Sequence, residues 1–111
     1  MTNQASVLSE NKEVKAAIYN FQQWISMTEP EALRTSFNTI LSLSGYKVLN
    51  FTEHLFPNGG YTCIWLLAES HLAIHTFIAE NKTYIELSSC NKKMNILFKN
   101  EFDKKFGTIC C

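Results

Sequence analysis

Two apolar runs joined by three polar residues constrain this chain more than any other feature. The runs cover residues 61–68 and 72–78, and Glu69, Ser70 and His71 separate them. The junction has none of the Asn-Gly, Asp-Gly or proline-containing pairs that usually turn a hairpin. An acid, a hydroxyl and an imidazole between two buried strands are poorly explained by turning alone. They are the materials of nucleophilic and acid–base chemistry.

The composition is that of one folded domain. With 111 residues, of which 46% are apolar and 18% charged, the chain can form one core and is too small for two. The formal net charge is zero and like charges form no run, so neither nucleic acid nor an anionic membrane is favoured as a partner. No apolar stretch approaches the roughly 20 residues that span a bilayer, and the N-terminus lacks the basic and apolar regions of a signal peptide. We therefore expect a cytoplasmic protein.

The first part of the chain predicts a tail, a strand and a helix. Residues 1–12 are polar and are expected to be a flexible N-terminal tail, and residues 13–111 to form a single domain. Residues 13–24 favour a strand, with a helix as the alternative.

The helix that follows is the best-marked element of the sequence. Thr28, followed three residues later by Glu31, has the form of a capping box. Apolar residues then recur at helical spacing up to Gly45, which is placed to end a helix. This predicts an amphipathic helix over about 30–44.

The remainder predicts four strands and a second helix. Residues 61–68 are apolar on both faces, as in a strand covered by helices on one side and by something else, such as a second subunit, on the other. The predicted segments are strands at 46–56, 61–68, 72–78 and 83–89, a turn at 57–60, and a helix between Asn91 and Gly107. We expect the α+β class: a two-layer sandwich of a mainly antiparallel four- to five-stranded sheet with two helices on one face.

A two-residue loop at 81–82 would set the register of the last hairpin. Cys90 would then lie opposite Ala73, on the same face as His75. A slip of one residue would move Cys90 to the other face. In the predicted register, Ser70, His75 and Cys90 converge.

At these residues the chain resembles a known family. The run Leu66-Leu67-Ala68-Glu69-Ser70-His71 with Ile74-His75-Thr76 is similar to the processing site of the prokaryotic S-adenosylmethionine decarboxylases, small pyruvoyl enzymes of polyamine and spermidine biosynthesis. Three further positions extend the resemblance. Cys90 stands twenty residues after Ser70, as the family's catalytic cysteine does after its processing serine, Phe56 matches a family phenylalanine, and Gly60-Tyr61-Thr62 resembles a Gly-x-Thr entry to the central strand.

The resemblance implies autocatalytic cleavage of a zymogen. Ser70 would attack the Glu69 carbonyl to form an ester, His75 would accept a proton in the elimination that cuts the chain, and a pyruvoyl group would remain at position 70. Thr62 and Cys90 would support this rearrangement, and His71 is a neighbour whose function is more often structural. No metal is implied.

The resemblance also implies how the mature enzyme works. The pyruvoyl group would form a Schiff base with the substrate amine and accept the electrons released with CO₂. Cys90 would return a proton to the substrate carbon, and Phe56 would stack on adenine. Two processed protomers would form a homodimer.

Structural explanations of the same residues remain open. Ser70 can be a strand-end serine, His75 a hydrogen-bonded core histidine and Cys90 a small buried hydrophobe. A zinc site from Cys63, Cys90, His71 and His75 would match no established zinc spacing.

One departure from the family pattern concerns the substrate. Family members usually continue His-Thr-Trp-Pro-Glu, and that glutamate resembles a clamp on the ribose, whereas Ala79 stands in its place here. Glu86, which the predicted register faces to Phe77, is a candidate replacement. Three hypotheses follow: an S-adenosylmethionine decarboxylase, a pyruvoyl decarboxylase of ornithine or arginine, and a non-catalytic structural or regulatory homologue.

Overall fold

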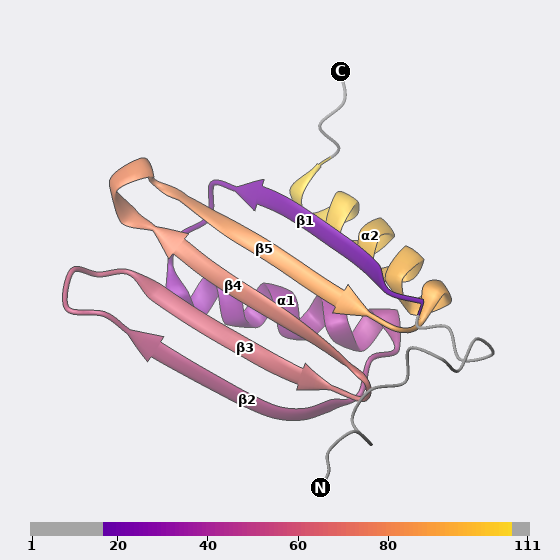
Figure 1. Ribbon diagram of the computed structural model, residues 1–111. Helices are drawn as coiled ribbons and strands as arrows, with labels where there is room; N and C mark the ends of the chain where they lie inside the picture. Colours follow the sequence, from indigo (N-terminus) through magenta and orange to yellow (C-terminus); the bar gives the residue numbers. More distant parts are fainter. Residues whose placement is uncertain (1–16, 108–111) are drawn as a thin grey trace, which may run out of the picture.

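The computed structural model describes residues 17–107 as an antiparallel sheet backed by two helices (Figure 1). The strands lie in the order β1-β5-β4-β3-β2, and each neighbouring pair is antiparallel. The predicted fold class and order of elements are confirmed, while the predicted tail, residues 1–12, lies outside the described residues. The elements are β1 (Tyr19–Ile25), α1 (Pro30–Ser44), β2 (Val48–Leu55), β3 (Tyr61–Leu67), β4 (Ser70–Phe77), the 3-10 helix η2 (Ile78–Glu80), β5 (Lys82–Ser89) and α2 (Lys92–Phe106).

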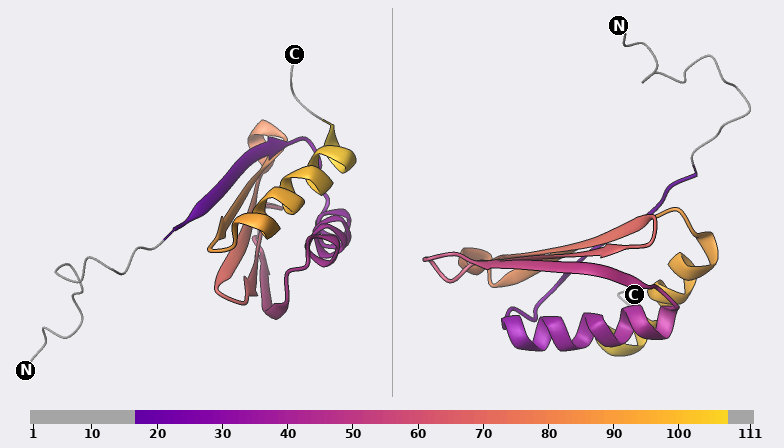
Figure 2. Two further views of the ribbon diagram at one scale, coloured as in Figure 1. Left: turned by 90° about the vertical axis from the view of Figure 1, so that its right-hand side faces the viewer. Right: turned by 90° about the horizontal axis from the view of Figure 1, so that it is seen from below.

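Both helices pack on the same face of the sheet, and the core lies between the two layers (Figure 2). Phe37 of α1 lies 6.3 Å from Phe98 of α2 and 6.4 Å from Trp65 of β3, measured between ring centroids. Because successive residues of a strand point to opposite faces, each strand contributes every second side chain to this core. The fully buried apolar residues include Leu33, Leu41, Leu67, Leu72, Ile74, Ile85 and Leu87.

The N-terminus of α1 differs from its prediction by one residue. The predicted cap, Thr28, is wrong: Glu29 caps the helix, and its carboxylate accepts a 2.7 Å hydrogen bond from the N–H of Ala32. Pro30 is the reason, because proline is favoured at the first helical position and holds the residue before it in an extended conformation. Gly45 ends the helix as predicted, at φ 89, where a residue with a Cβ is strained.

β3 and β4 are joined by a two-residue turn that the sequence does not signal. Ser70 pairs with Leu67, which leaves Ala68 and Glu69 in the turn. Glu69 has a φ of 60, a left-handed conformation that costs such a residue about 1 kcal/mol or more. The N–H of Ala68 donates a 3.2 Å hydrogen bond to the carbonyl of Lys47, which fixes the turn to the segment before β2. The polar junction is therefore a turn, and a strained one.

The predicted register of β4 and β5 is wrong by four residues. Ala73 faces Glu86 and not Cys90. The cause is the connection, because η2 and Asn81 fill four positions where a two-residue loop was expected. A shift by an even number keeps each strand residue on its predicted face. Cys90, however, falls beyond the end of β5.

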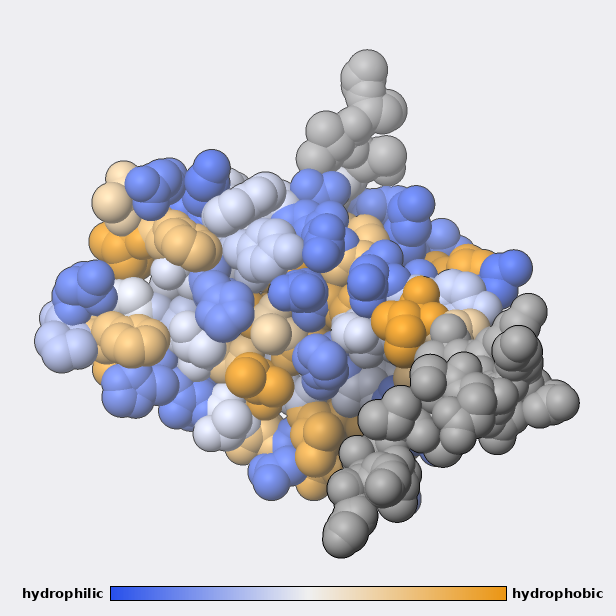
Figure 3. Space-filling model, in the orientation of Figure 1, coloured by the Kyte–Doolittle hydropathy of each residue, from blue (hydrophilic) through white to orange (hydrophobic). Residues whose placement is uncertain are grey.

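The face of the sheet away from the helices, here called the open face, carries exposed apolar side chains among polar ones (Figure 3). Ile64, Leu66, Trp24 and Phe77 are between 37% and 49% exposed. Within residues 17–107, the strand residues of 61–68 are thus covered on one face only. In the described part of the chain, neither α1 nor α2 is long and apolar enough to cross a bilayer.

Candidate active site

Ser70 occupies the first position of β4, directly after the strained Glu69. Its side chain is 8% exposed and shares the helix-covered face of the strand with the buried Leu72. The Ser70 hydroxyl donates a hydrogen bond to Ser89 Oγ at 3.3 Å and accepts one from the N–H of Cys90, also at 3.3 Å. Both distances are long for such bonds. The hydroxyl is therefore oriented without being held tightly.

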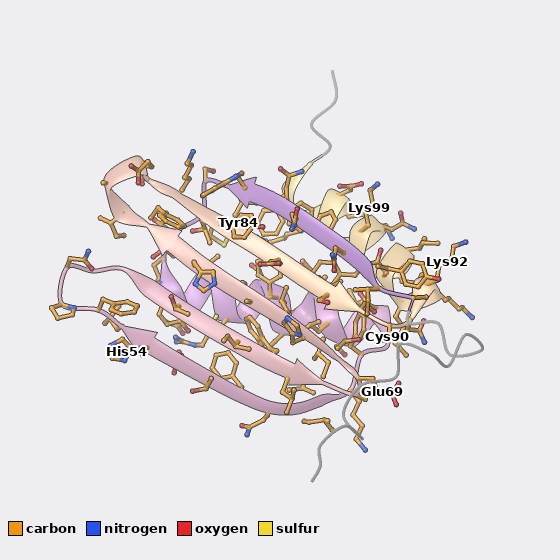
Figure 4. All side chains as sticks on the ribbon, viewed as in Figure 1. His54, Glu69, Tyr84, Cys90, Lys92 and Lys99 are labelled. Carbon is orange, nitrogen blue, oxygen red and sulfur yellow. The ribbon has the colours of Figure 1, made fainter. Side chains whose placement is uncertain are left out.

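A cavity of about 270 Å³ opens beside Ser70. Three connections meet here: the one from α1 to β2, the turn between β3 and β4, and the one from β5 to α2. Figure 4 shows Glu69 and Cys90 at this same end of the sheet. The structure therefore brings Ser70, the bond before it and Cys90 around one hollow. The lining residues are Gly45, Tyr46, Lys47, Ala68, Glu69, Ser70, Cys90, Asn91 and Met94.

Two residues of this site carry no recognisable signal in the sequence. Ser89 is 1% exposed, and Tyr46, 7% exposed, donates a 2.5 Å hydrogen bond to its oxygen. Burial raises the pKa of Tyr46 above its usual range, and the bond to Ser89 only partly opposes that shift. Tyr46 is therefore a protonated donor at neutral pH. Only the position of Ser89 before Cys90, and of Tyr46 after the glycine that ends α1, could have suggested them.

His75 lies away from Ser70, so the predicted convergence of three residues is wrong for His75. The two residues are five positions apart on β4, about 17 Å along the strand, and an odd separation places them on opposite faces. On the open face, His75 pairs with Thr62 across the strands, and its Nδ1 lies 3.1 Å from Thr62 Oγ1. Thr62 and His75 therefore form a unit of their own.

The other residues that the family resemblance implicated do not share the Ser70 face and cavity. Phe56 follows β2 at the opposite end of the sheet, where its ring packs edge-on against His54 at 4.5 Å (Figure 4). Glu86 lies on the open face, opposite Ala73 and not opposite Phe77 as predicted. His71 lies on that face too, and it is exposed.

The residues of the zinc alternative do not meet. Cys63 is fully buried on the helix side of β3, and burial raises the pKa of its thiol to about 12. His71 and His75 are on the open face, and Cys90 is beyond β5. Within residues 17–107, no three His, Cys, Asp or Glu side chains are placed to hold a metal ion.

The fold has a solved counterpart. The structure superposes on the crystal structure of the adenosylmethionine decarboxylase of Aquifex aeolicus VF5 with a TM-score of 0.64, over 84% of this chain and 79% of that one. The sequence identity is 14%, so the likeness concerns the two-layer α+β fold alone.

The family follows from the sequence. The model of the S-adenosylmethionine decarboxylase family matches residues 8–106, and the chain therefore belongs to that family. It is 38% identical over 58 residues to an S-adenosylmethionine decarboxylase proenzyme of Prochlorococcus marinus strain MIT 9313, covering 52% of this chain and 46% of that protein. It is 44% identical over 48 residues to S-adenosylmethionine decarboxylase proenzyme 2 of Bacillus anthracis, covering 43% and 39%. The matched region thus spans about half the length of these relatives or less.

Proposed function

We propose that this protein is a self-processing decarboxylase of S-adenosylmethionine that acts in the cytoplasm through a pyruvoyl group made from Ser70. The observation that carries the proposal is the geometry around one bond. The Glu69–Ser70 peptide bond joins a strained turn to β4, and the Ser70 hydroxyl and Cys90 border the same cavity. The names of the two relatives, which describe proenzymes, support a precursor that matures.

Maturation needs no reagent other than the protein itself and water. Ser70 Oγ attacks the Glu69 carbonyl carbon, the carbon–nitrogen bond breaks, and the hydroxyl proton ends on the freed amine. A base then removes the Cα proton of residue 70, and the Cβ–oxygen bond breaks to release a Glu69 carboxylate. The remaining unsaturated amine takes up water and loses ammonia, which leaves a keto group at position 70. The strain at Glu69 favours cleavage as a whole, because the turn can open once the chain is cut.

The residues present fit such a group. A pyruvoyl group supplies an electron sink for the pair released when CO₂ leaves an amino acid. Cys90 borders the cavity and is exposed to it, so its thiol can hold the proton that the substrate carbon takes up. The buried surroundings of Ser70 limit access of water to the reacting atoms.

Cys90→Ala tests this assignment of the thiol. We expect chain cleavage to continue, while turnover of the amine substrate falls by roughly 10²-fold or more, the usual contribution of a positioned proton donor. The processed variant should accumulate substrate covalently attached to the shorter C-terminal chain after reduction with cyanoborohydride, as detected by mass spectrometry. Wild-type turnover in the processed variant would contradict the assignment, and Cys63→Ala is the matched control because that thiol is buried elsewhere.

We propose that the working form is a homodimer packed through the open faces. Ser70 and Cys90 lie at one end of the sheet. Thr62 and His75 on the open face, and Phe56 just after β2, lie toward the other end. A two-fold axis running between two open faces and across the strands would place one end of each sheet over the opposite end of its partner. The exposed apolar side chains of the open face would be buried by this contact.

The substrate is the second part of the proposal. The family and the stacking surface of Phe56 favour S-adenosylmethionine, whereas Ala79 supplies no carboxylate to a ribose. Glu86 on the open face is the available acid. Losing one charge-assisted hydrogen bond would weaken binding by about 10- to 150-fold.

The deciding assay measures CO₂ release by the processed protein from S-adenosylmethionine, ornithine and arginine in parallel. We expect release from S-adenosylmethionine, with a high KM that rises further in Glu86→Gln. Release from ornithine or arginine alone would overturn the substrate and keep the chemistry. No release from any of the three by fully processed protein would favour a non-catalytic homologue.

A further inference from the structure

The hydroxyl of Ser89 receives hydrogen bonds from both sides of the site. Its oxygen lies 2.5 Å from the Tyr46 hydroxyl, 3.1 Å from the N–H of Asn91 and 3.3 Å from the Ser70 hydroxyl, so three donors share its two lone pairs and Tyr46 makes the shortest contact. Its own hydrogen is directed to the Asn91 carbonyl at 3.2 Å. Because a serine hydroxyl has one hydrogen, Ser89 meets Ser70 as an acceptor.

The contacts of Ser70 use its hydroxyl hydrogen and one of its two lone pairs. Its hydrogen points to Ser89, and one lone pair accepts the N–H of Cys90. The second lone pair has no partner within the described residues and is free to approach the Glu69 carbonyl carbon. Without Ser89, the O–H bond could rotate, and the lone pair needed for attack would lose its direction.

Tyr46 holds Ser89 in this position. The tyrosine follows Gly45, and its N–H donates to the carbonyl of Leu41, so the end of α1 fixes its backbone. Its bond to Ser89 is the shortest that Ser89 makes, and Tyr46 keeps its hydrogen at neutral pH because its pKa is raised. Among the described residues, Ser89 is the acceptor of that hydrogen.

We propose that Ser89 is the positioning residue for the nucleophilic oxygen of Ser70, and that Tyr46 is in turn the positioning residue for Ser89. This inference rests on the proposed self-processing. It assigns to both residues a function in the first step, in which the Ser70 oxygen bonds to the Glu69 carbon and its proton passes to the amide nitrogen. Neither residue exchanges a proton with the reacting atoms.

The test follows cleavage of newly translated protein in a cell-free system, with pulse labelling and a chase. Ser89→Ala should slow cleavage roughly tenfold, the effect of losing one orienting hydrogen bond, and Ser89→Thr, which keeps the hydroxyl, should restore it. Tyr46→Phe should slow cleavage by a smaller factor. The double variant should be no slower than Ser89→Ala, because Tyr46 acts only through Ser89.

Tyr61→Phe is the matched control for Tyr46→Phe. Tyr61 is buried like Tyr46, and its hydroxyl donates a hydrogen bond to Glu53 that phenylalanine cannot make. It lies, however, at the other end of β3 from Ser70. Its loss should lower the unfolding midpoint without slowing cleavage. Cleavage of folded Ser89→Ala within about twofold of wild type, additive effects in the double variant, or equal slowing by Tyr61→Phe would overturn the inference. Wild-type protein that stays uncut would instead overturn the proposed self-processing.

Discussion

Purified wild-type protein should give two chains in an intact-mass spectrum, residues 1–69 and residues 70–111, and Ser70→Ala should give one. The second chain should be blocked to Edman degradation, because a keto group stands where its amine would be. The variant loses cleavage completely, since no other atom of residue 70 can form the ester. This is the largest effect that the structure leads us to expect.

Two controls separate this result from misfolding and from proteolysis. Ser70→Ala removes a single oxygen from a partly satisfied site, so its unfolding midpoint should stay near that of wild type. Ser70→Cys retains a nucleophile and should still cut, at a lower rate. A wild-type chain that remains whole after long incubation, with Met1 as its sole N-terminus, would refute the pyruvoyl chemistry.

The helices could be predicted because their signals are local. Asn91 caps α2 by accepting from the N–H of Met94, and Gly107 ends the helix, as the sequence predicts. The cap of α1 was misplaced because two signals compete there. Thr28 satisfies the spacing of a capping box, but the fixed φ of Pro30 defines where the helix starts, and this makes Glu29 the cap.

The errors in the sheet have a different origin, because they depend on turn geometry. Ile78 is β-branched and apolar, so it looks like strand, yet it begins the 3-10 turn that shifts β5 by four residues. Glu69 adopts a left-handed conformation that its residue type does not announce. Such conformations are imposed by the pairing of the flanking strands and are not encoded by the turn residues alone.

The candidate site could be predicted only in part, because some of its residues carry a local signal and others meet only in the folded chain. Ser70 and Cys90 stand out by residue type and by the family spacing, and the fold brings them together. Ser89 and Tyr46 come from distant segments, 43 residues apart, and meet only through the packing of α1 against the sheet. The separation of Ser70 from His75 could have been deduced from their odd spacing on one strand.

That separation leads to a prediction about two chains. If His75 assists cleavage, it must act on the Ser70 of a second copy, because it lies on the opposite face of its own strand. His75→Ala alone should then cut roughly 10² to 10⁴ times more slowly than wild type, and Ser70→Ala alone should not cut. Co-expressed, the two variants should restore cleavage, since a mixed dimer pairs an intact Ser70 with an intact His75.

The mixed experiment identifies which chain is cut. Only the His75→Ala chain retains Ser70, so a mass tag on that chain should appear on the fragments, and about half of the two-variant dimers formed at random should be mixed. Co-expression with a chain carrying both Ser70→Ala and His75→Ala supplies the matched control and should restore nothing. If mixed dimers form and stay uncut, His75 does not act across the interface. If His75→Ala cuts as fast as wild type, the Thr62–His75 pair is structural, and its 3.1 Å contact only helps to hold β3 against β4 on the open face.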